Sequence, residues 1–308
     1  MGVFLTRAGW REHPLFALPF SLVSGLASVV AMAHGYDSGR LNLPFVGIAT
    51  FGKYPYQPDW SEIDADVCIL GAPFDFGTQW RAGARFGPRA IRDASTLFAF
   101  GHAGAYDHED GVTYLGPGTR ILDLGDADIV HTDTEASHAK SEDGVRQILA
   151  AGALPVVLGG DHSVNIPCIR AFDDQDPIHI VQIDAHLDFV DERHGVRHGH
   201  GNPLRRAAAR DHVSGLSRVP ADARLYLTID IDGFDPSIAP GTGTPSHGGF
   251  LYYEVLELLA ALAARQPIVG LDLVEVAPDY DRDGTTAILA AQLLLNVIGR
   301  ILHRKKAA

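Results

Sequence analysis

Three side chains that can bind metal ions follow an apolar run of the sequence at alternate positions. Asp184, His186 and Asp188 stand in the segment Asp-Ala-His-Leu-Asp, directly after residues 178–183. In an extended chain, residues at i, i+2 and i+4 point to the same side, so these side chains can converge where a strand ends. The segment therefore predicts part of a metal site.

Further polar residues follow other apolar runs. His162 follows the run 154–158, Asp230 and Asp232 follow the run 224–229, and Glu275 follows the run 267–273. Four aspartates and two histidines exceed the ligands that one ion needs, and they predict two ions that share bridging carboxylates. Carboxylates and imidazoles without cysteine favour Mn²⁺, and Ni²⁺, Zn²⁺ and Fe²⁺ are also compatible with them. The reaction class that such a pair of ions indicates is metal-assisted hydrolysis.

Simpler interpretations exist for two of these segments. Asp-Ile-Asp-Gly at 230–233 could belong to a calcium loop, but Phe234 occupies the next ligand position. Gly-Gly-Asp-His at 159–162 could be a helix entry with Asp161 or Ser163 as the N-cap, which is compatible with a metal-binding His162.

Short apolar runs alternate with helical patterns from about residue 65 to the end. The strands are expected at 65–70, 154–158, 178–183, 224–229 and 267–273, and the helices at 88–99, 137–151, 165–173, 203–209, 252–265 and 285–303. This alternation predicts an α/β fold, a three-layer αβα sandwich with a central, mostly parallel sheet. In such sheets ligands bind beyond the carboxyl ends of the strands, which is where the polar residues stand.

The bulk composition bounds the partners. The chain has 308 residues and a net charge of −13, which argues against nucleic acid or an anionic membrane and favours a cationic ligand. Its two cysteines, Cys68 and Cys168, lie in apolar surroundings, so neither a disulfide framework nor a zinc ribbon is expected. A reducing, cytoplasmic location fits this usage.

The N-terminus complicates that location. Residues 14–33 carry no charge, follow Arg7 and Arg11, and end on Ala-Met-Ala. This pattern is typical of a secretory signal or a membrane anchor, although a mis-assigned start or an apolar arm that packs on a neighbouring subunit would read the same way. We expect residues 1–40 to be an N-terminal extension and residues 41–308 to form one domain.

Three motifs resemble the signatures of the ureohydrolases, the family of arginases and agmatinases that release urea from guanidino compounds. They are Gly-Gly-Asp-His-Ser at 159–163, Asp-Ala-His-Leu-Asp at 184–188, and the segment 230–245 from Asp-Ile-Asp-Gly-Phe-Asp-Pro to Gly-Thr-Gly-Thr-Pro. The resemblance covers most of the chain from about residue 40 and implies the arginase-like fold with two Mn²⁺ ions. It implies that His162 and Asp188 complete one site, that His186 and Asp232 complete the other, and that Asp184 and Asp230 bridge them.

The resemblance also implies the residues that handle substrate. Glu275, in Asp-Leu-Val-Glu-Val-Ala-Pro, matches the glutamate that pairs with the guanidinium group. His200, in His-Gly-His-Gly-Asn-Pro, matches the histidine that passes a proton to the leaving amine, and Asn202 of the same motif is expected to contact substrate. Homo-oligomers, trimers or hexamers, are common in this family.

The sequence departs from the family at two places after Asp188. Arginases carry an asparagine at the position of Val190, so the chain resembles the agmatinase-like branch, with agmatine, guanidinobutyrate, guanidinopropionate and bulkier guanidino acids as candidate substrates. Between Asp188 and Asp230 the chain is shorter than the family pattern by about one βα unit, roughly 30 residues. The alternative to an active enzyme is therefore a degenerate paralogue that binds metal or regulates another subunit.

Overall fold

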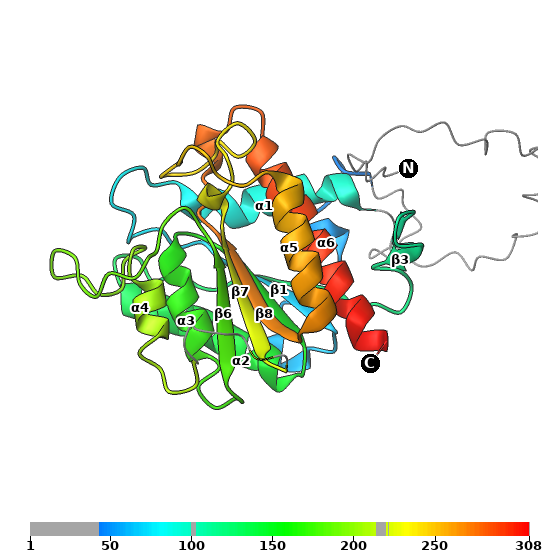
Figure 1. Cartoon of the computed structure of the whole chain (residues 1–308), viewed down its shortest axis with the longest axis horizontal. Coiled ribbons are helices and arrows are strands. Elements are labelled where there is room, and N and C mark those ends of the chain that lie inside the picture. Colours follow the sequence, from blue (N-terminus) through cyan, green and yellow to red (C-terminus); the bar gives the residue numbers. More distant parts are fainter. Residues whose placement is uncertain (1–42, 100–102, 214–219, 221, 308) are drawn as a thin grey trace, which may run out of the picture.

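The computed structural model describes residues 43–99, 103–213, 220 and 222–307. The N-terminal extension, including the apolar segment 14–33, lies outside the described residues, so its predicted role and the division of the chain at residue 40 stay predictions. Figure 1 shows the described chain as one sheet between two sets of helices.

The central sheet has six strands in the order β4-β1-β5-β8-β7-β6, and every pairing between neighbours is parallel. The strands are β1 (Val67–Ala72), β4 (Ile121–Asp126), β5 (Leu154–Gly159), β6 (Ile178–Ile183), β7 (Arg224–Asp230) and β8 (Ile268–Val274). Five of the six were predicted, because strands covered by helices on both faces are apolar along their whole length. The predicted αβα sandwich is confirmed.

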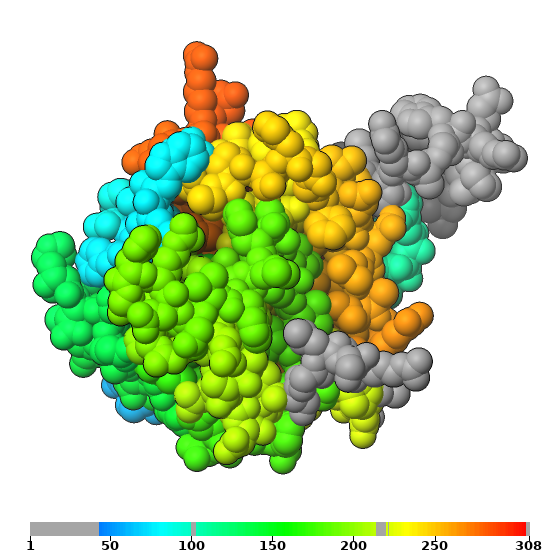
Figure 2. All heavy atoms as spheres, turned by 60° about the vertical axis from the view of Figure 1, so that its left-hand side comes forward, coloured from blue at the N-terminus to red at the C-terminus, as the bar shows by residue number. Residues whose placement is uncertain are grey.

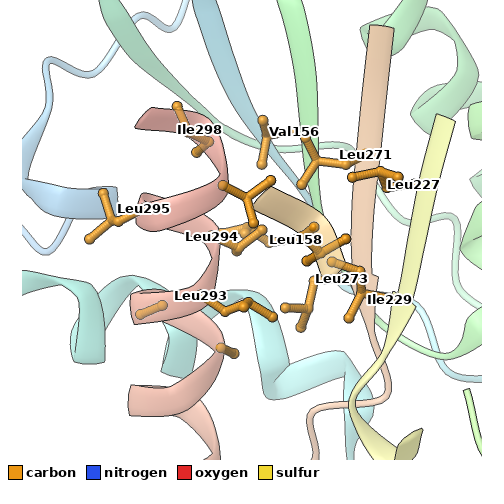
Figure 3. Packing of buried hydrophobic residues seen from close by; sticks show 14 of the residues in the cluster. Val156, Leu158, Leu227, Ile229, Leu271, Leu273, Leu293, Leu294, Leu295 and Ile298 are labelled. Atoms are coloured by element: carbon orange, nitrogen blue, oxygen red, sulfur yellow. The ribbon is translucent and has the colours of Figure 1, made fainter. Parts of the chain in front are cut away.

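Helices cover both faces of the sheet. One face packs against α1 (Gly87–Ser95), α5 (Tyr252–Arg265) and α6 (Thr285–Ala307), and the other against α2 (Thr134–Ala150), α3 (Asn165–Arg170) and α4 (Pro203–Ala207). Figure 3 shows the first of these layers, where Leu293, Leu294 and Ile298 of α6 lie against the strand residues Leu158 and Leu273. The six predicted helices are all present, with ends that differ by a few residues.

Helix α6 is long and apolar enough to cross a membrane by composition alone. However, 72% of its most apolar window is buried inside the protein, and Leu293 and Leu294 are fully buried against the sheet. The apolar character of α6 is therefore that of a core helix.

Strand β4 and a small hairpin were not predicted. The hairpin joins β2 (Ala105–Asp107) to β3 (Val112–Tyr114). Strand β4 contains Asp123, which is 1% exposed and forms an ion pair with Arg92 of α1 at 2.9 Å. The charged Asp123 interrupts the apolar run by which a buried strand is recognised. Its partner Arg92 comes from a distant helix, so the local sequence does not show that Asp123 is buried.

Strand β6 lies at the end of the sheet. Among the described residues it pairs along its length only with β7, and on its other side it has a single bridge, from Ile178 to Val213. Its four central residues are half-buried, whereas those of β1, β5 and β7 are buried. The shortened segment after Asp188 therefore leaves β6 at the edge and the interior of the sheet intact.

Candidate metal centre

The sheet order brings the predicted residues to one edge. Strands β5, β8, β7 and β6 are neighbours in that order, so the residues that follow them meet beyond their carboxyl ends. His162 follows β5, Glu275 follows β8, Asp230 ends β7 and Asp184 follows β6. Chain segments up to 113 residues apart thus meet, as the 2.9 Å hydrogen bond from His162 N to Glu275 Oε1 shows.

Four of the predicted ligands form a first cluster around the ring of His162. Its Nδ1 atom lies 3.1 Å from Asp184 Oδ2, 2.9 Å from Asp188 Oδ2 and 3.2 Å from Asp230 Oδ2. His162 is fully buried, and Asp230 is 2% exposed. The four ligand atoms lie within 4.8 Å of one another, which is close enough to hold one ion.

The other nitrogen of His162 fixes which atom faces the carboxylates. Its Nε2 lies 2.9 Å from Thr228 Oγ1, and the Thr228 hydroxyl donates to Asp272 Oδ1 at 2.6 Å. The hydroxyl proton is therefore committed to Asp272, so His162 Nε2 donates to Thr228 and Nδ1 is left as a lone pair.

The surroundings of His162 Nδ1 show whether these residues fit a metal ion. The buried Nδ1 atom has no hydrogen-bond partner among the described residues, although three carboxylate oxygens lie about it. A lone pair that faces three carboxylates is repulsive by itself, and a divalent cation makes it favourable. The residues fit a metal ion, held by a histidine whose second nitrogen is oriented by an outer hydrogen-bond chain.

Asp184, His186 and Asp232 form a second cluster that shares Asp184 with the first. His186 Nδ1 lies 3.1 Å from Asp232 Oδ2 and 3.6 Å from Asp184 Oδ1. Thr244 donates its hydroxyl to Asp232 Oδ2 at 3.0 Å and so orients this carboxylate. The hydrogen bond with Asp232, and the charges of the nearby aspartates, raise the pKa of His186 to about 9. These six residues carry a surplus of negative charge that suits two cations.

Glu275 and His200 lie in contact with each other beside the clusters. His200 Nδ1 is 3.2 Å from Glu275 Oε1, and Glu275 is 2% exposed. Burial opposes the charged form of His200, but the hydrogen bond and charge of Glu275 outweigh it and raise the pKa. Burial and the charge of Glu275 also raise the pKa of Asp161 to about 7.

Unusual backbone conformations hold several of these residues. Asp188 has a φ of 45° and Glu275 a φ of 63°, a region that residues other than glycine rarely adopt. Gly160 allows the chain to pass close to Phe74, since a Cβ atom at this position would lie 1.7 Å from the Phe74 carbonyl oxygen. Asp161 caps the following turn through Ser163 N, as expected.

The structure separates the three histidines of the segment 194–200. His198 forms an ion pair with Glu135, away from the clusters, and His194 stands in a tight turn with a φ of 52°. His200 alone of these three contacts Glu275. The family resemblance pointed to His200 among these three histidines, and His200 is the one placed beside Glu275.

Asn202 lies in the loop that carries His200, and its expected contact with substrate stays a prediction. It is 2% exposed, its Oδ1 accepts from Gly199 N at 2.9 Å, and its Nδ2 donates to Val190 O at 2.6 Å. These bonds to the backbone engage both ends of the amide, so Asn202 fixes the loop that carries His200.

A cavity of about 780 Å³ opens above the clusters. Its floor contains Asp188, Asp230, Asp232, Glu275 and His200, and Trp80 stands at its rim with 71% of its surface exposed. In Figure 2 the opening lies where the cyan, green and yellow segments meet. Arg81 holds the rim in place, because it stacks between Trp80 and Tyr280 and donates to the carbonyl groups of Thr242 and Gly243.

Sequence reasoning missed Thr228, Asp272 and Thr244, which orient the ligands. Thr228 and Asp272 are register partners on β7 and β8. One polar residue within an apolar run does not by itself indicate a role beside a metal ligand. The sheet order places Thr228 and Asp272 next to each other and so makes them partners of His162.

Comparison with known proteins gives the family. The sequence matches the Arginase family over residues 65–216 and 214–299. Proclavaminate amidinohydrolase of Streptomyces clavuligerus is 33% identical over 301 aligned positions, which cover 81% of this chain and 91% of that protein. Guanidinopropionase of Pseudomonas aeruginosa is 33% identical over 302 positions, which cover 82% and 92%. The chain belongs to the arginase family.

Solved structures agree with this arginase-family assignment. The structure of proclavaminate amidinohydrolase from Streptomyces clavuligerus has a TM-score of 0.74 at 30% identity, and covers 85% of this chain and 99% of that one. This chain therefore belongs to the agmatinase-like branch of the family, whose members hydrolyse C–N bonds in linear amidines. The arginase family depends on two metal ions. The two clusters are the place in this chain where such ions fit.

The comparison also locates the departure from the family. The two matched segments of this arginase-family chain meet at residues 214–216, within the predicted shortening. The alignment with the Streptomyces enzyme has 301 positions but uses 81% of the 308 residues here, so it includes positions that this chain lacks. The two matched segments meet after edge strand β6, and all six predicted ligands lie outside residues 214–216.

Proposed function

We propose that this chain uses two Mn²⁺ ions to hydrolyse a linear guanidino compound to urea and an amine. One observation carries the proposal: six candidate ligands from three strand ends form two clusters that share Asp184. His162, Asp184, Asp188 and Asp230 would hold one ion, and Asp184, His186 and Asp232 the other. The bridging role expected for Asp230 is part of the proposal, although only Asp184 belongs to both clusters.

Bound ions of this kind supply Lewis acidity and a water molecule activated for attack. The chain's own residues orient the ligands and the substrate. Thr228 and Asp272 fix the ring of His162, and Thr244 fixes the carboxylate of Asp232. Such outer contacts keep the ligand atoms in position while the reaction proceeds.

Glu275 is suited to the guanidinium group of the substrate. Its carboxylate is buried at the floor of the cavity, and a planar, cationic guanidinium forms charge-assisted hydrogen bonds with a carboxylate. His200 lies 3.2 Å from the same carboxylate. Burial lowers the pKa of His200, but Glu275 outweighs it and raises the pKa, which favours the protonated ring that can give a proton to the amine as the C–N bond breaks.

The test is urea release by the full chain loaded with Mn²⁺ and offered guanidinobutyrate, guanidinopropionate and agmatine. We expect urea from at least one of them. Asp184→Asn should lower the bound metal and abolish turnover, because Asp184 belongs to both clusters. Asp235→Asn is the matched control, since Asp235 lies three residues beyond Asp232 and accepts hydrogen bonds from Ser237 and Gly248, away from the clusters.

Removal of metal by a chelator should abolish urea release, and added Mn²⁺ should restore it. Addition of Ni²⁺, Zn²⁺ or Fe²⁺ in place of Mn²⁺ to the same metal-free sample tests which ion restores urea release. Two ions bound per chain without urea from any guanidine would refute the proposal and favour the non-catalytic paralogue.

A further inference from the structure

The cavity above the clusters has an uneven distribution of charge. Its floor is anionic, with Asp188, Asp230, Asp232 and Glu275. Its outer wall contains one arginine, Arg193, and no acidic residue among the described residues that line it away from the floor. Asp230, Asp232 and Glu275 are buried, whereas Arg193 is exposed, so a ligand that fills the cavity meets negative charge in its depth and positive charge nearer the surface.

Arg193 stands at the base of a tight turn. Its backbone N–H and carbonyl group pair with those of Val196 at 2.9 Å, and the two residues between them, His194 and Gly195, both have positive φ, at 52° and 81°. Two-residue turns of this kind are the ones that fit hairpins. The turn presents the Arg193 side chain to the cavity from a defined backbone position.

The other arginines of this region are engaged by Asp191. Arg197 contacts both carboxylate oxygens of Asp191 at 3.0 and 3.1 Å, and Arg205 and Arg206 also form ion pairs with it. Arg193 forms no ion pair with any residue that the structure describes. Its guanidinium group is thus the cation of this loop that remains available to a ligand.

Apolar side chains also line the cavity. Leu187 is 82% exposed, Phe189 is 44% exposed and Val190 is 43% exposed, and all three line the cavity together with Trp80. Large apolar groups exposed side by side in a cavity are typical of a binding surface. Their position suits the methylene chain of a ligand whose charged ends reach the floor and the rim.

We infer that Arg193 binds a carboxylate at the tail of the substrate, so that the site selects ω-guanidino carboxylates over guanidines with a neutral or cationic tail. This inference rests on the proposed function. An arginine offers a planar fork of donors that matches a carboxylate, whereas the ammonium tail of agmatine would lie against a like charge. The anionic floor and cationic rim together match a zwitterionic substrate.

The experiment compares guanidinobutyrate, butylguanidine and agmatine, which share the guanidinium group and differ in the tail. Arg193→Met should lower kcat/KM for guanidinobutyrate by about 10- to 100-fold, mainly through KM, since a hydrogen bond to a charged group has about this effect. The value for butylguanidine should stay within about twofold. Arg193→Glu should reverse the preference, so that agmatine becomes the better substrate.

Arg197→Met is the matched control, because Arg197 lies on the same loop but pairs with Asp191. It should leave the preference among the three tails unchanged. Urea release by Arg193→Met with an unaltered preference would overturn this inference and leave the proposed function standing. Failure of the unmodified chain to hydrolyse any guanidine would overturn both.

Discussion

Substitution of Thr228 by valine tests whether the outer hydrogen-bond chain holds the metal ligand His162. The change keeps the shape of the side chain and removes its hydroxyl group. Two hydrogen bonds are lost, the 2.9 Å contact with His162 Nε2 and the 2.6 Å bond to Asp272 Oδ1. Asp272 keeps the donors Asn165 Nδ2 at 2.8 Å and Tyr226 Oη at 2.9 Å, so the larger effect falls on the imidazole.

The size of the effect follows from these contacts. A buried ring N–H without a partner costs about 1–3 kcal/mol in stability. Loss of the group that orients a ligating histidine lowers metal affinity by about 10- to 100-fold, which corresponds to about 1.4–2.7 kcal/mol of binding free energy. We expect both effects in Thr228→Val, and neither in Thr228→Ser, which retains the hydroxyl group.

Two measurements separate these effects. Calorimetric titration of the metal-free protein with Mn²⁺ gives the dissociation constant, and denaturant unfolding of the same protein gives the free energy of unfolding. If Thr228→Val binds Mn²⁺ within about twofold of the unmodified chain, the hydroxyl group does not orient His162 and our account of the centre is wrong. A loss of the same size in Thr228→Ser would contradict it as well.

Two further predictions concern stability. Burial, with the charges of Arg170 and His198, lowers the pKa of His138 to about 3, so the unfolded chain takes up a proton below about pH 6.5 that the folded chain refuses until about pH 3. The free energy of unfolding should fall as the pH drops through this window, by about 2 kcal/mol between pH 6.5 and 5. Urea unfolding midpoints measured across this pH range should fall less in His138→Gln than in the unmodified chain. The same dependence on pH in both proteins would contradict the prediction. Arg92→Met should lower the free energy of unfolding by about 3–5 kcal/mol, because it leaves the buried carboxylate of Asp123 without its cation. A loss below about 1 kcal/mol, or an Arg92→Lys variant as unstable as Arg92→Met, would refute this role of the Arg92 charge.

The sequence predicted the parts of the fold in which local pattern and tertiary structure agree. Strands β5, β7 and β8 are apolar because helices cover both of their faces, and their ends carry the chemistry because parallel strands end at one edge. Strand β4 escaped this reasoning, since the cation that compensates the buried Asp123 is Arg92, which lies 31 positions earlier in the chain. No local pattern contains that information.

The same distinction applies to the candidate site. The spacing of Asp184, His186 and Asp188 predicts convergence from alternation along an extended chain. The three side chains do reach the two clusters, although the strand ends at Ile183 and the chain bends before Asp188, whose φ is 45°. The partnership of His162 with Thr228 and Asp272 depends on the order of three strands, which the spacing of residues within one strand does not determine. The backbone contacts of Asn202 with Gly199 and Val190 depend on the shape of the loop, which the motif does not determine either.

The edge position of β6 has a consequence for how such a protein changes over time. The candidate ligands stand at the ends of β5, β6 and β7, and two of these strands lie inside the sheet, whereas the two family-model segments meet at residues 214–216, outside the residues that line the cavity. Gain or loss of residues at this junction can alter the edge of the sheet and leave the candidate ligands in register. The candidate metal centre and the outer edge of the sheet can therefore evolve as separate modules, the first under constraint and the second free to diversify.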